Sequence, residues 1–177
     1  MKIEQTDFEG LYIIDSFSSD DIRGSFTKCF SSFKNKKFQL AETYYSVNKK
    51  DVIRGMHFQT PPFEHQKIVH VIKGAVMDVV IDLRPNSNTF RKVFNTELSE
   101  NNKKALFVEK GFAHGFKTLE DNTIMLYMVS SVFNEKHDDG IHYQSIGFDW
   151  DVKDPIVSKR DNELSMVDDF IKNNPFV

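Results

Sequence analysis

The sequence has few of the residues that would place it in an oxidising compartment or a membrane. Its 177 residues include a single cysteine, Cys29, which cannot form an intramolecular disulfide or, by itself, a thiolate metal site. No apolar run approaches the roughly 18 residues that span a bilayer, and residues 1–5 lack the basic start and apolar core of a signal peptide. We therefore expect a cytoplasmic protein that does not enter the membrane.

Strong charge and nucleotide-binding loops are lacking too. The formal net charge is only -3, which argues against a dedicated nucleic-acid binder but leaves room for a local basic pocket for a phosphorylated small molecule. The chain has no glycine-rich phosphate loop of the Walker or dinucleotide type and no Gly-x-Ser-x-Gly elbow. A nucleophilic hydrolase is therefore disfavoured.

What the chain does contain is a series of short β-forming runs separated by turn signals. These runs predict strands at residues 10–15, 41–47, 53–59, 67–72, 75–83, 91–98, 105–108 and 123–129. Two of them flank the Lys73-Gly74 step, which predicts a hairpin. Residues 18–24 are expected to form a loop, and the aromatic-rich residues 111–116 a turn.

Helical spacing is persuasive only near the C-terminus, where four apolar residues recur on one face: Leu164, Val167, Phe170 and Ile171. Ser158 or Asp161 could cap this helix. Many short strands without alternating helices, followed by one late helix, predict an all-β fold. An antiparallel jelly-roll barrel fits the number of strands best, and no linker divides residues 1–177 into more than one domain.

A dense polar cluster lies in residues 53–59, and Lys67 follows at the head of the next strand. Within six residues it offers the cation of Arg54, the titratable base of His57 and the amide of Gln59. The structural interpretation is a strand end where Arg54 and Gln59 face water and His57 is partly buried. Other side chains suited to acid–base chemistry are spread along the chain: Asp78, Asp82, His114, Tyr127 and Asp161. Alternation within residues 75–83 puts the first two on one strand face.

The histidines also suggest a metal site, because residues 111–114 echo one half of the metal-binding signature of cupin barrels. The other half requires His-x-His and a nearby glutamate. Here His57 is followed by Phe58 and Gln59, and the next histidine is His65. Because that set of ligands is incomplete, we expect no metal and no other cofactor.

Six ordered motifs cover nearly the whole chain: Arg23-Gly24-x-Phe26, Arg54-Gly55-Met56-His57-Phe58-Gln59, Gln66-Lys67, Gly74 with Asp78 to Arg84, Gly111 to Phe116, and Leu126-Tyr127. In these motifs the chain resembles the dTDP-4-dehydrorhamnose 3,5-epimerase family, whose members are metal-independent cupin-fold enzymes acting on nucleotide-linked 4-keto sugars. The resemblance implies a cupin-type barrel and an isomerase.

The resemblance also implies roles for four residues. His57 corresponds to the base that removes a proton beside the ketone, Tyr127 to the acid, and Lys67 to the cation near the developing oxyanion. Asp161 corresponds to the carboxylate that orients the histidine. The structural alternatives are a helix cap for Asp161, a buried strand tyrosine for Tyr127 and a solvated strand end for Lys67.

Substrate-binding positions follow from the same resemblance. Arg23, Arg54 and His114 match positions that hold the diphosphate and neighbouring groups, and Gln59 belongs to the same motif as Arg54. Phe133 falls where the family places a tyrosine that stacks on the nucleobase. The sequence departs from the family at three further positions: Lys28 replaces an acidic residue, and Glu42 and Tyr44 replace a Gln-x-Asn pair that contacts the base.

These three departures change charge and hydrogen bonding where a thymine would be recognised. The expected substrate is therefore a GDP-4-keto-heptose used for capsular or surface polysaccharide, with Glu42 accepting hydrogen bonds from guanine. The alternative is dTDP-4-dehydro-6-deoxyglucose, on the route to dTDP-L-rhamnose. Inversion at C3 alone, or at both C3 and C5, is left open.

Other functions remain open on the same fold. They are a nucleotide-sugar 3,4-ketoisomerase, a metal-dependent cupin oxygenase, and a module that binds a nucleotide sugar without converting it. The resemblance also implies a homodimer whose N-terminal strands reach the partner, so that Arg23 would serve the neighbouring site.

Overall fold

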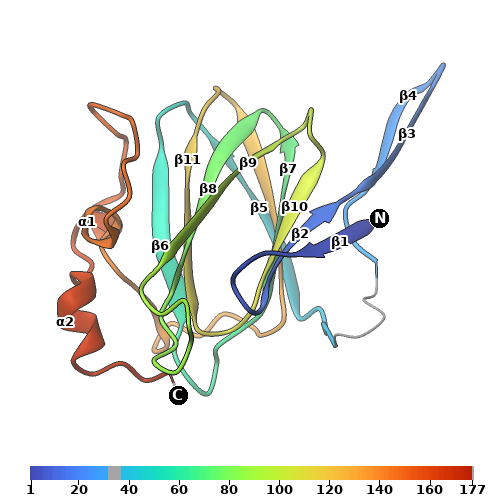
Figure 1. Cartoon of the computed structure of the whole chain (residues 1–177). Helices are drawn as coiled ribbons and strands as arrows, with labels where there is room; N and C mark the ends of the chain where they lie inside the picture. Colours follow the sequence, from blue (N-terminus) through green and yellow to red (C-terminus); the bar gives the residue numbers. More distant parts are fainter. Residues whose placement is uncertain (32–36, 177) are drawn as a thin grey trace.

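The computed structural model describes residues 1–31 and 37–176, and it confirms the all-β, cupin-type jelly-roll barrel (Figure 1). A six-stranded sheet of order β1-β2-β10-β7-β12-β5 faces a five-stranded sheet of order β13-β6-β11-β8-β9, and β3 pairs with β4. The strands are β1 (Lys2–Gln5), β2 (Leu11–Asp15), β3 (Phe17–Asp21), β4 (Gly24–Lys28), β5 (Glu42–Asn48), β6 (Ile53–Gln59), β7 (Lys67–Lys73), β8 (Ala75–Asp82), β9 (Val93–Ser99), β10 (Lys104–Val108), β11 (Phe112–Thr118), β12 (Thr123–Val129) and β13 (Asp138–Gly140).

Apolar side chains form three layers, and two of them enclose the five-stranded sheet. One cluster fills the space between the sheets, with Val69 and Leu106 from one side and Val80 and Phe116 from the other. A second covers the outer face of the five-stranded sheet, against the C-terminal segment that carries Trp150. This burial explains why β8 is apolar on both faces except at its two aspartates. The third cluster lies on the outer face of the six-stranded sheet.

The predicted hairpin of residues 67–72 and 75–83 is wrong. β7 pairs with β10 and β12, whereas β8 pairs with β11 and β9, so the chain changes sheets at Gly74. Gly74 has a φ of +77°, in the left-handed region that favours glycine, and its N–H donates to the Glu100 carboxylate at 2.8 Å. A tight corner between two sheets and a hairpin turn have the same local sequence pattern. Which of the two forms depends on the strands that pair with β7 and β8, and these are far away in sequence.

Two segments predicted as loop and turn are strands. Residues 18–24 contribute to the hairpin of β3 and β4, which projects from the barrel (Figure 1). Residues 112–116 belong to β11, between β6 and β8. Gly115 on β11 and Gly55 on β6 allow the two strands to pack closely. A Cβ on Gly115 would lie 2.6 Å from the Arg54 carbonyl oxygen, and a Cβ on Gly55 would lie 2.5 Å from the Gly115 Cα. This close approach brings β6 and β11 together, with His57 opposite His114.

The C-terminal region has two short helices where one was predicted, both outside the five-stranded sheet (Figure 1). The helices are α1 (Lys159–Asn162) and α2 (Val167–Ile171), and a short 3-10 turn, η1 (Tyr143–Ile146), precedes them. Ser158, one of the two expected caps, caps α1 by accepting a hydrogen bond from the Asp161 N–H at 3.1 Å, whereas α2, which carries the predicted apolar repeat from Val167 on, has no side-chain cap. Within residues 1–31 and 37–176 no helix is long and apolar enough to cross a membrane.

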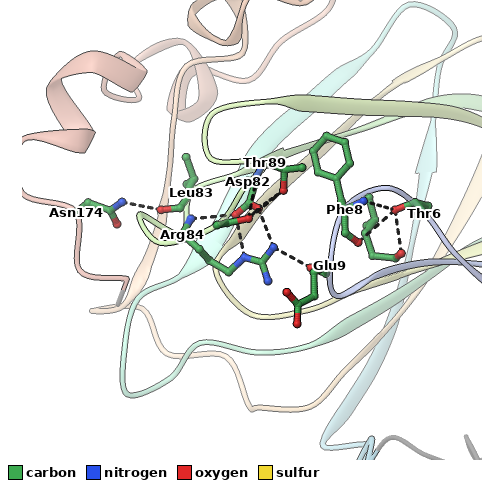
Figure 2. A network of polar contacts seen from close by, with 10 residues as sticks. Thr6, Phe8, Glu9, Asp82, Leu83, Arg84, Thr89 and Asn174 are labelled. Carbon is green, nitrogen blue, oxygen red and sulfur yellow. Dashed lines mark hydrogen bonds and ion pairs between the residues drawn. The ribbon is translucent and has the colours of Figure 1, made fainter.

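A buried carboxylate holds the turn that follows β8, and this turn also contacts residues 9 and 174 (Figure 2). Asp82 is fully buried and accepts hydrogen bonds from Arg84 Nη2 at 2.7 Å, Ser87 Oγ at 2.6 Å and Thr89 Oγ1 at 2.7 Å. Arg84 also donates to the Glu9 carbonyl at 2.8 Å. Burial would raise the pKa of Asp82, but these donors hold it below the ordinary value. Close to this network, Asn174 Nδ2 donates to the Leu83 carbonyl at 2.6 Å.

Replacing Asp82 with asparagine should lower the free energy of unfolding by roughly 3 kcal/mol, because it leaves the partly buried Arg84 guanidinium without its counter-charge and removes a fully buried charged acceptor from Ser87 and Thr89. Urea denaturation at neutral pH measures the loss. The matched control is Asp168→Asn, whose ion pair with Arg91 is largely exposed, so its cost should stay below about 1 kcal/mol. The stability that the Asp82 carboxylate contributes is lost as pH falls through its lowered pKa. The difference in unfolding free energy between wild type and Asp82→Asn should therefore become smaller in acid. An equal loss of unfolding free energy in Asp82→Asn and Asp168→Asn would contradict this role of Asp82.

Candidate active site

A cavity of about 450 Å³ opens between the two sheets, and nine of the predicted site residues line it. They come from strands of both sheets and from the segment after β12: His57, Gln59, Arg54, Lys67, His114, Tyr127, Glu42, Tyr44 and Phe133. Its other polar lining residues are Ser46, His65, Ser131, Asp138 and Arg160. The fold therefore gathers the polar cluster of residues 53–59 with side chains that are distant in sequence.

His57 and Asp161 form a hydrogen-bonded pair in the cavity wall. His57 Nε2 lies 2.8 Å from Asp161 Oδ1, and Asp161 Oδ2 accepts a hydrogen bond from the Gly55 N–H at 3.1 Å. Burial would raise the pKa of Asp161, but His57 and the Gly55 N–H lower it, so the carboxylate is ionised and can only accept. His57 must then carry its proton on Nε2. Its Nδ1, which has no partner within the described part of the chain, keeps a lone pair that can accept a proton.

Lys67 enters the cavity from β7, in the opposite sheet. It is 7% exposed, and its Nζ donates to the His57 carbonyl oxygen at 3.4 Å. Burial lowers the pKa of Lys67 to about 8, and the charges of Asp78 and Asp138 offset only part of that effect. A cation in a poorly solvated site interacts strongly with a developing negative charge.

This lowered pKa predicts the alkaline limit of activity. If the Lys67 cation is required, kcat/KM should fall as pH rises through about 8, because Lys67 then loses its proton. A pH–rate profile measures this fall of kcat/KM, which forms the alkaline limb of the profile. In Lys67→Arg the side chain stays charged over the whole working range, so the variant should be slower but should not show this limb. An unchanged limb in that variant would assign it to another group.

Tyr127 lies on β12, also in the sheet opposite His57. Its ring stacks on Tyr44 with the centroids 4.9 Å apart, and its hydroxyl lies 3.3 Å from Ser46 Oγ. Burial raises the pKa of Tyr127 well above the ordinary value, which keeps the phenol protonated. His57 and Tyr127 therefore offer a proton acceptor and a proton donor from opposite walls of one cavity.

His114 and Asp78 form a second pair at the floor of the site. Both are buried, and His114 Nε2 lies 2.9 Å from Asp78 Oδ2. Burial lowers the pKa of His114, and the Asp78 charge opposes this only in part. Burial also raises the pKa of Asp78, with His114 and Lys67 opposing the rise.

Further polar residues at the cavity have fixed partners. Arg54 Nε donates to Asn48 Oδ1 at 2.7 Å. Gln59 donates through Nε2 to the Phe63 carbonyl at 2.8 Å and accepts through Oε1 from the Asn134 N–H at 2.6 Å. These bonds position the amide against the loops at the cavity rim, where it also meets His65 Nδ1 at 3.2 Å.

Two predicted binding residues lie outside the cavity of their own chain. Arg23 and Lys28 are on the projecting β3–β4 hairpin, and neither lines the cavity (Figure 1). Arg23 pairs only with Asp21 within the described residues, through Nε at 3.0 Å. A single chain therefore does not bring these two cations to the site.

Sequence reasoning missed several cavity residues. Arg160 pairs with Asp138 at 2.7 Å, and both line the cavity beside the His57–Asp161 pair. Arg160 precedes Asp161 directly, which was a usable signal, whereas Asp138 lies in a stretch without strand periodicity. Ser46 shares a β5 face with Glu42 and Tyr44 through alternation. Within the described residues no three histidine, cysteine, aspartate or glutamate side chains are grouped to hold a metal.

Comparisons with known proteins give matches that cover most of the chain. The sequence model of the dTDP-4-dehydrorhamnose 3,5-epimerase family matches residues 5–169. The enzyme of that name from Escherichia coli K12 is 33% identical and covers 97% of each chain. A dTDP-4-dehydrorhamnose 3-epimerase from Streptomyces niveus is 29% identical over 94% of this chain and 84% of its own. The structure of the Bacillus anthracis 3,5-epimerase, with TDP and PPi bound, has a TM-score of 0.90 at 32% identity, over 94% of this chain and 99% of that chain.

Proposed function

This chain belongs to the dTDP-4-dehydrorhamnose 3,5-epimerase family and is an epimerase of nucleotide-linked sugars, and on that premise we propose that it inverts C3 and C5 of dTDP-4-dehydro-6-deoxyglucose. The observation that carries the proposal is the placement of the His57–Asp161 pair and Tyr127 on opposite walls of one cavity. Inversion of a carbon needs a proton to leave one face and another to arrive on the opposite face.

The first step is removal of the proton next to the ketone. His57 Nδ1 accepts it, and Asp161 stabilises the resulting imidazolium through the 2.8 Å contact to Nε2. The carbanion delocalises onto the C4 oxygen as an enolate. Lys67, held as a cation in a buried site, stabilises that oxyanion.

The second step is protonation from the other side. Tyr127 projects from the six-stranded sheet and donates its phenolic proton to the carbon, on the face opposite to His57. Arg54 at the cavity supplies a planar donor fork for the diphosphate, and the exposed ring of Phe133 at the rim can stack on the nucleobase.

Thymidine is preferred to guanosine as the nucleoside for two reasons. The relatives described above carry names of dTDP-sugar epimerases. Two of the residues that suggested guanine have other positions or partners, since Lys28 does not line the cavity and Glu42 Oε2 accepts the Phe133 N–H at 3.1 Å. GDP-4-keto-heptose remains the second candidate because Glu42 Oε1 lies at the cavity without a partner among the described residues.

Proton NMR in D2O tests both candidates. The protein is incubated with dTDP-4-dehydro-6-deoxyglucose and, separately, with the GDP-4-keto-heptose. We expect deuterium to enter at C3 and C5 of the dTDP sugar and the inverted product to accumulate. Turnover of the GDP sugar alone would favour the second candidate. No exchange with either sugar, in protein whose folding is verified by circular dichroism, would overturn the epimerase proposal.

We further propose that the enzyme works as a homodimer in which the β3–β4 hairpin of each protomer reaches the partner's cavity. The support is the distance of Arg23 from its own site and the exposure of Ile22 and Phe26 on the same hairpin. Light scattering gives the oligomeric state. Mixing Arg23→Ala with His57→Asn under exchange conditions should restore about a quarter of wild-type activity, because half of the dimers then hold one complete site. No recovery in exchanged dimers would show that Arg23 does not serve the partner.

A further inference from the structure

One face of β5 carries a continuous run of hydrogen bonds that ends at Tyr127. Arg54 Nε donates to Asn48 Oδ1 at 2.7 Å, and Asn48 Nδ2 lies 3.0 Å from Ser46 Oγ. Ser46 Oγ in turn lies 3.3 Å from the Tyr127 hydroxyl. Asn48 is 3% exposed, so the middle of the run is shielded from water. It joins the arginine placed for the diphosphate to the tyrosine placed as the acid.

The buried asparagine fixes the direction of the run from Arg54 to Ser46. The guanidinium of Arg54 can only donate, so it must meet the amide oxygen of Asn48. The backbone carbonyl of Thr123 can only accept, and it lies 3.2 Å from the amide nitrogen. Both ends of the amide are therefore assigned, and the nitrogen must donate to Ser46 Oγ. The Ser46 proton is left free to point at the phenol oxygen of Tyr127.

We propose that Ser46 is a positioning residue for Tyr127, donating to its phenol oxygen at the end of a directed chain from Arg54 through Asn48. Because Ser46 supplies the proton of this contact, the phenolic proton is not used in it and can point into the cavity. After that proton has moved to the sugar, the phenolate receives the Ser46 hydrogen bond. The 3.3 Å contact shortens as the negative charge forms, because hydrogen bonds to ions are shorter than neutral ones.

This proposal rests on the proposed function only for its kinetic test. Ser46→Ala should lower kcat roughly 10-fold to 100-fold, as for loss of a hydrogen bond to a charged group, with KM little changed. Ser46→Thr keeps the hydroxyl and should recover most of the rate. In a Tyr127→Phe background, Ser46→Ala should add nothing, because no phenol oxygen remains to accept. The proposal would be overturned if Ser46→Ala lowered kcat by the same factor in the Tyr127→Phe background as in wild type. It would also be overturned if Ser46→Thr were as slow as Ser46→Ala.

A measurement without substrate separates this proposal from the epimerase assignment. In protein labelled with [ζ-13C]tyrosine, the Tyr127 resonance is identified by its loss in Tyr127→Phe. Ser46→Ala should shift this resonance, since the hydrogen bond to the phenol oxygen is removed. Thr43→Val is the matched control, because Thr43 on the same strand donates to the backbone carbonyl of Tyr127 at 2.9 Å and not to its phenol. An unmoved resonance in Ser46→Ala would contradict the contact, whatever the enzyme acts on.

Discussion

Replacing His57 with asparagine is expected to lower kcat/KM by roughly 10²–10⁴-fold, the usual contribution of a positioned general base. Asparagine can still donate to Asp161, but it has no group that takes up a proton at neutral pH. Deuterium exchange at C3 and C5 should disappear together with product, because the first step is lost. Steady-state kinetics and NMR in D2O measure the two effects.

His142→Asn is the matched control, since this histidine caps a short turn outside the cavity by accepting the Gln144 N–H, and asparagine can accept there too.

Asp161→Asn should lower kcat/KM by a factor of similar order to His57→Asn. The Gly55 N–H would hold the amide oxygen, so the amide nitrogen would face His57 and select the tautomer with its proton on Nδ1. Retention of activity within tenfold in His57→Asn would remove His57 from the role of base.

Replacing Tyr127 with phenylalanine should lower product formation by roughly 10²–10⁴-fold while proton removal continues. The variant keeps the ring stacked on Tyr44 and loses only the donor on the face opposite to His57. Because the enolate can still form and be reprotonated by His57, recovered substrate should carry deuterium without inversion. The ratio of deuterium in recovered substrate to product formed is therefore the decisive measurement, and it should rise strongly over wild type.

Tyr45→Phe provides the control for Tyr127→Phe, since this neighbouring tyrosine is 68% exposed and on the other face of β5 from Tyr44. Its activity should equal that of wild type. Product formation by Tyr127→Phe at the wild-type rate would assign the acid to another group. Loss of exchange as well as product would instead place Tyr127 in the first step.

Local patterns were sufficient to predict the class of fold and the density of polar groups in one strand. Alternation along residues 75–83 placed Asp78 and Asp82 on one strand face, and the structure shows that both are fully buried. The helical repeat near the C-terminus was only partly right, because the chain breaks into α1 and α2. Contacts of Val167 with the second apolar cluster, more than helix propensity, hold that segment in place.

The sequence by itself determined the β-rich class, the shared strand face of Asp78 and Asp82 and, through ordered motifs, the family resemblance, because these depend on residue type and spacing along the chain. Only the tertiary structure decided that β7 and β8 belong to different sheets, and that Asp161 reaches His57 across 104 positions. It also assigned Ser46 to the Tyr127 phenol. Strand pairing and side-chain contact depend on partners that close in space, and no local pattern encodes which distant strand will lie alongside.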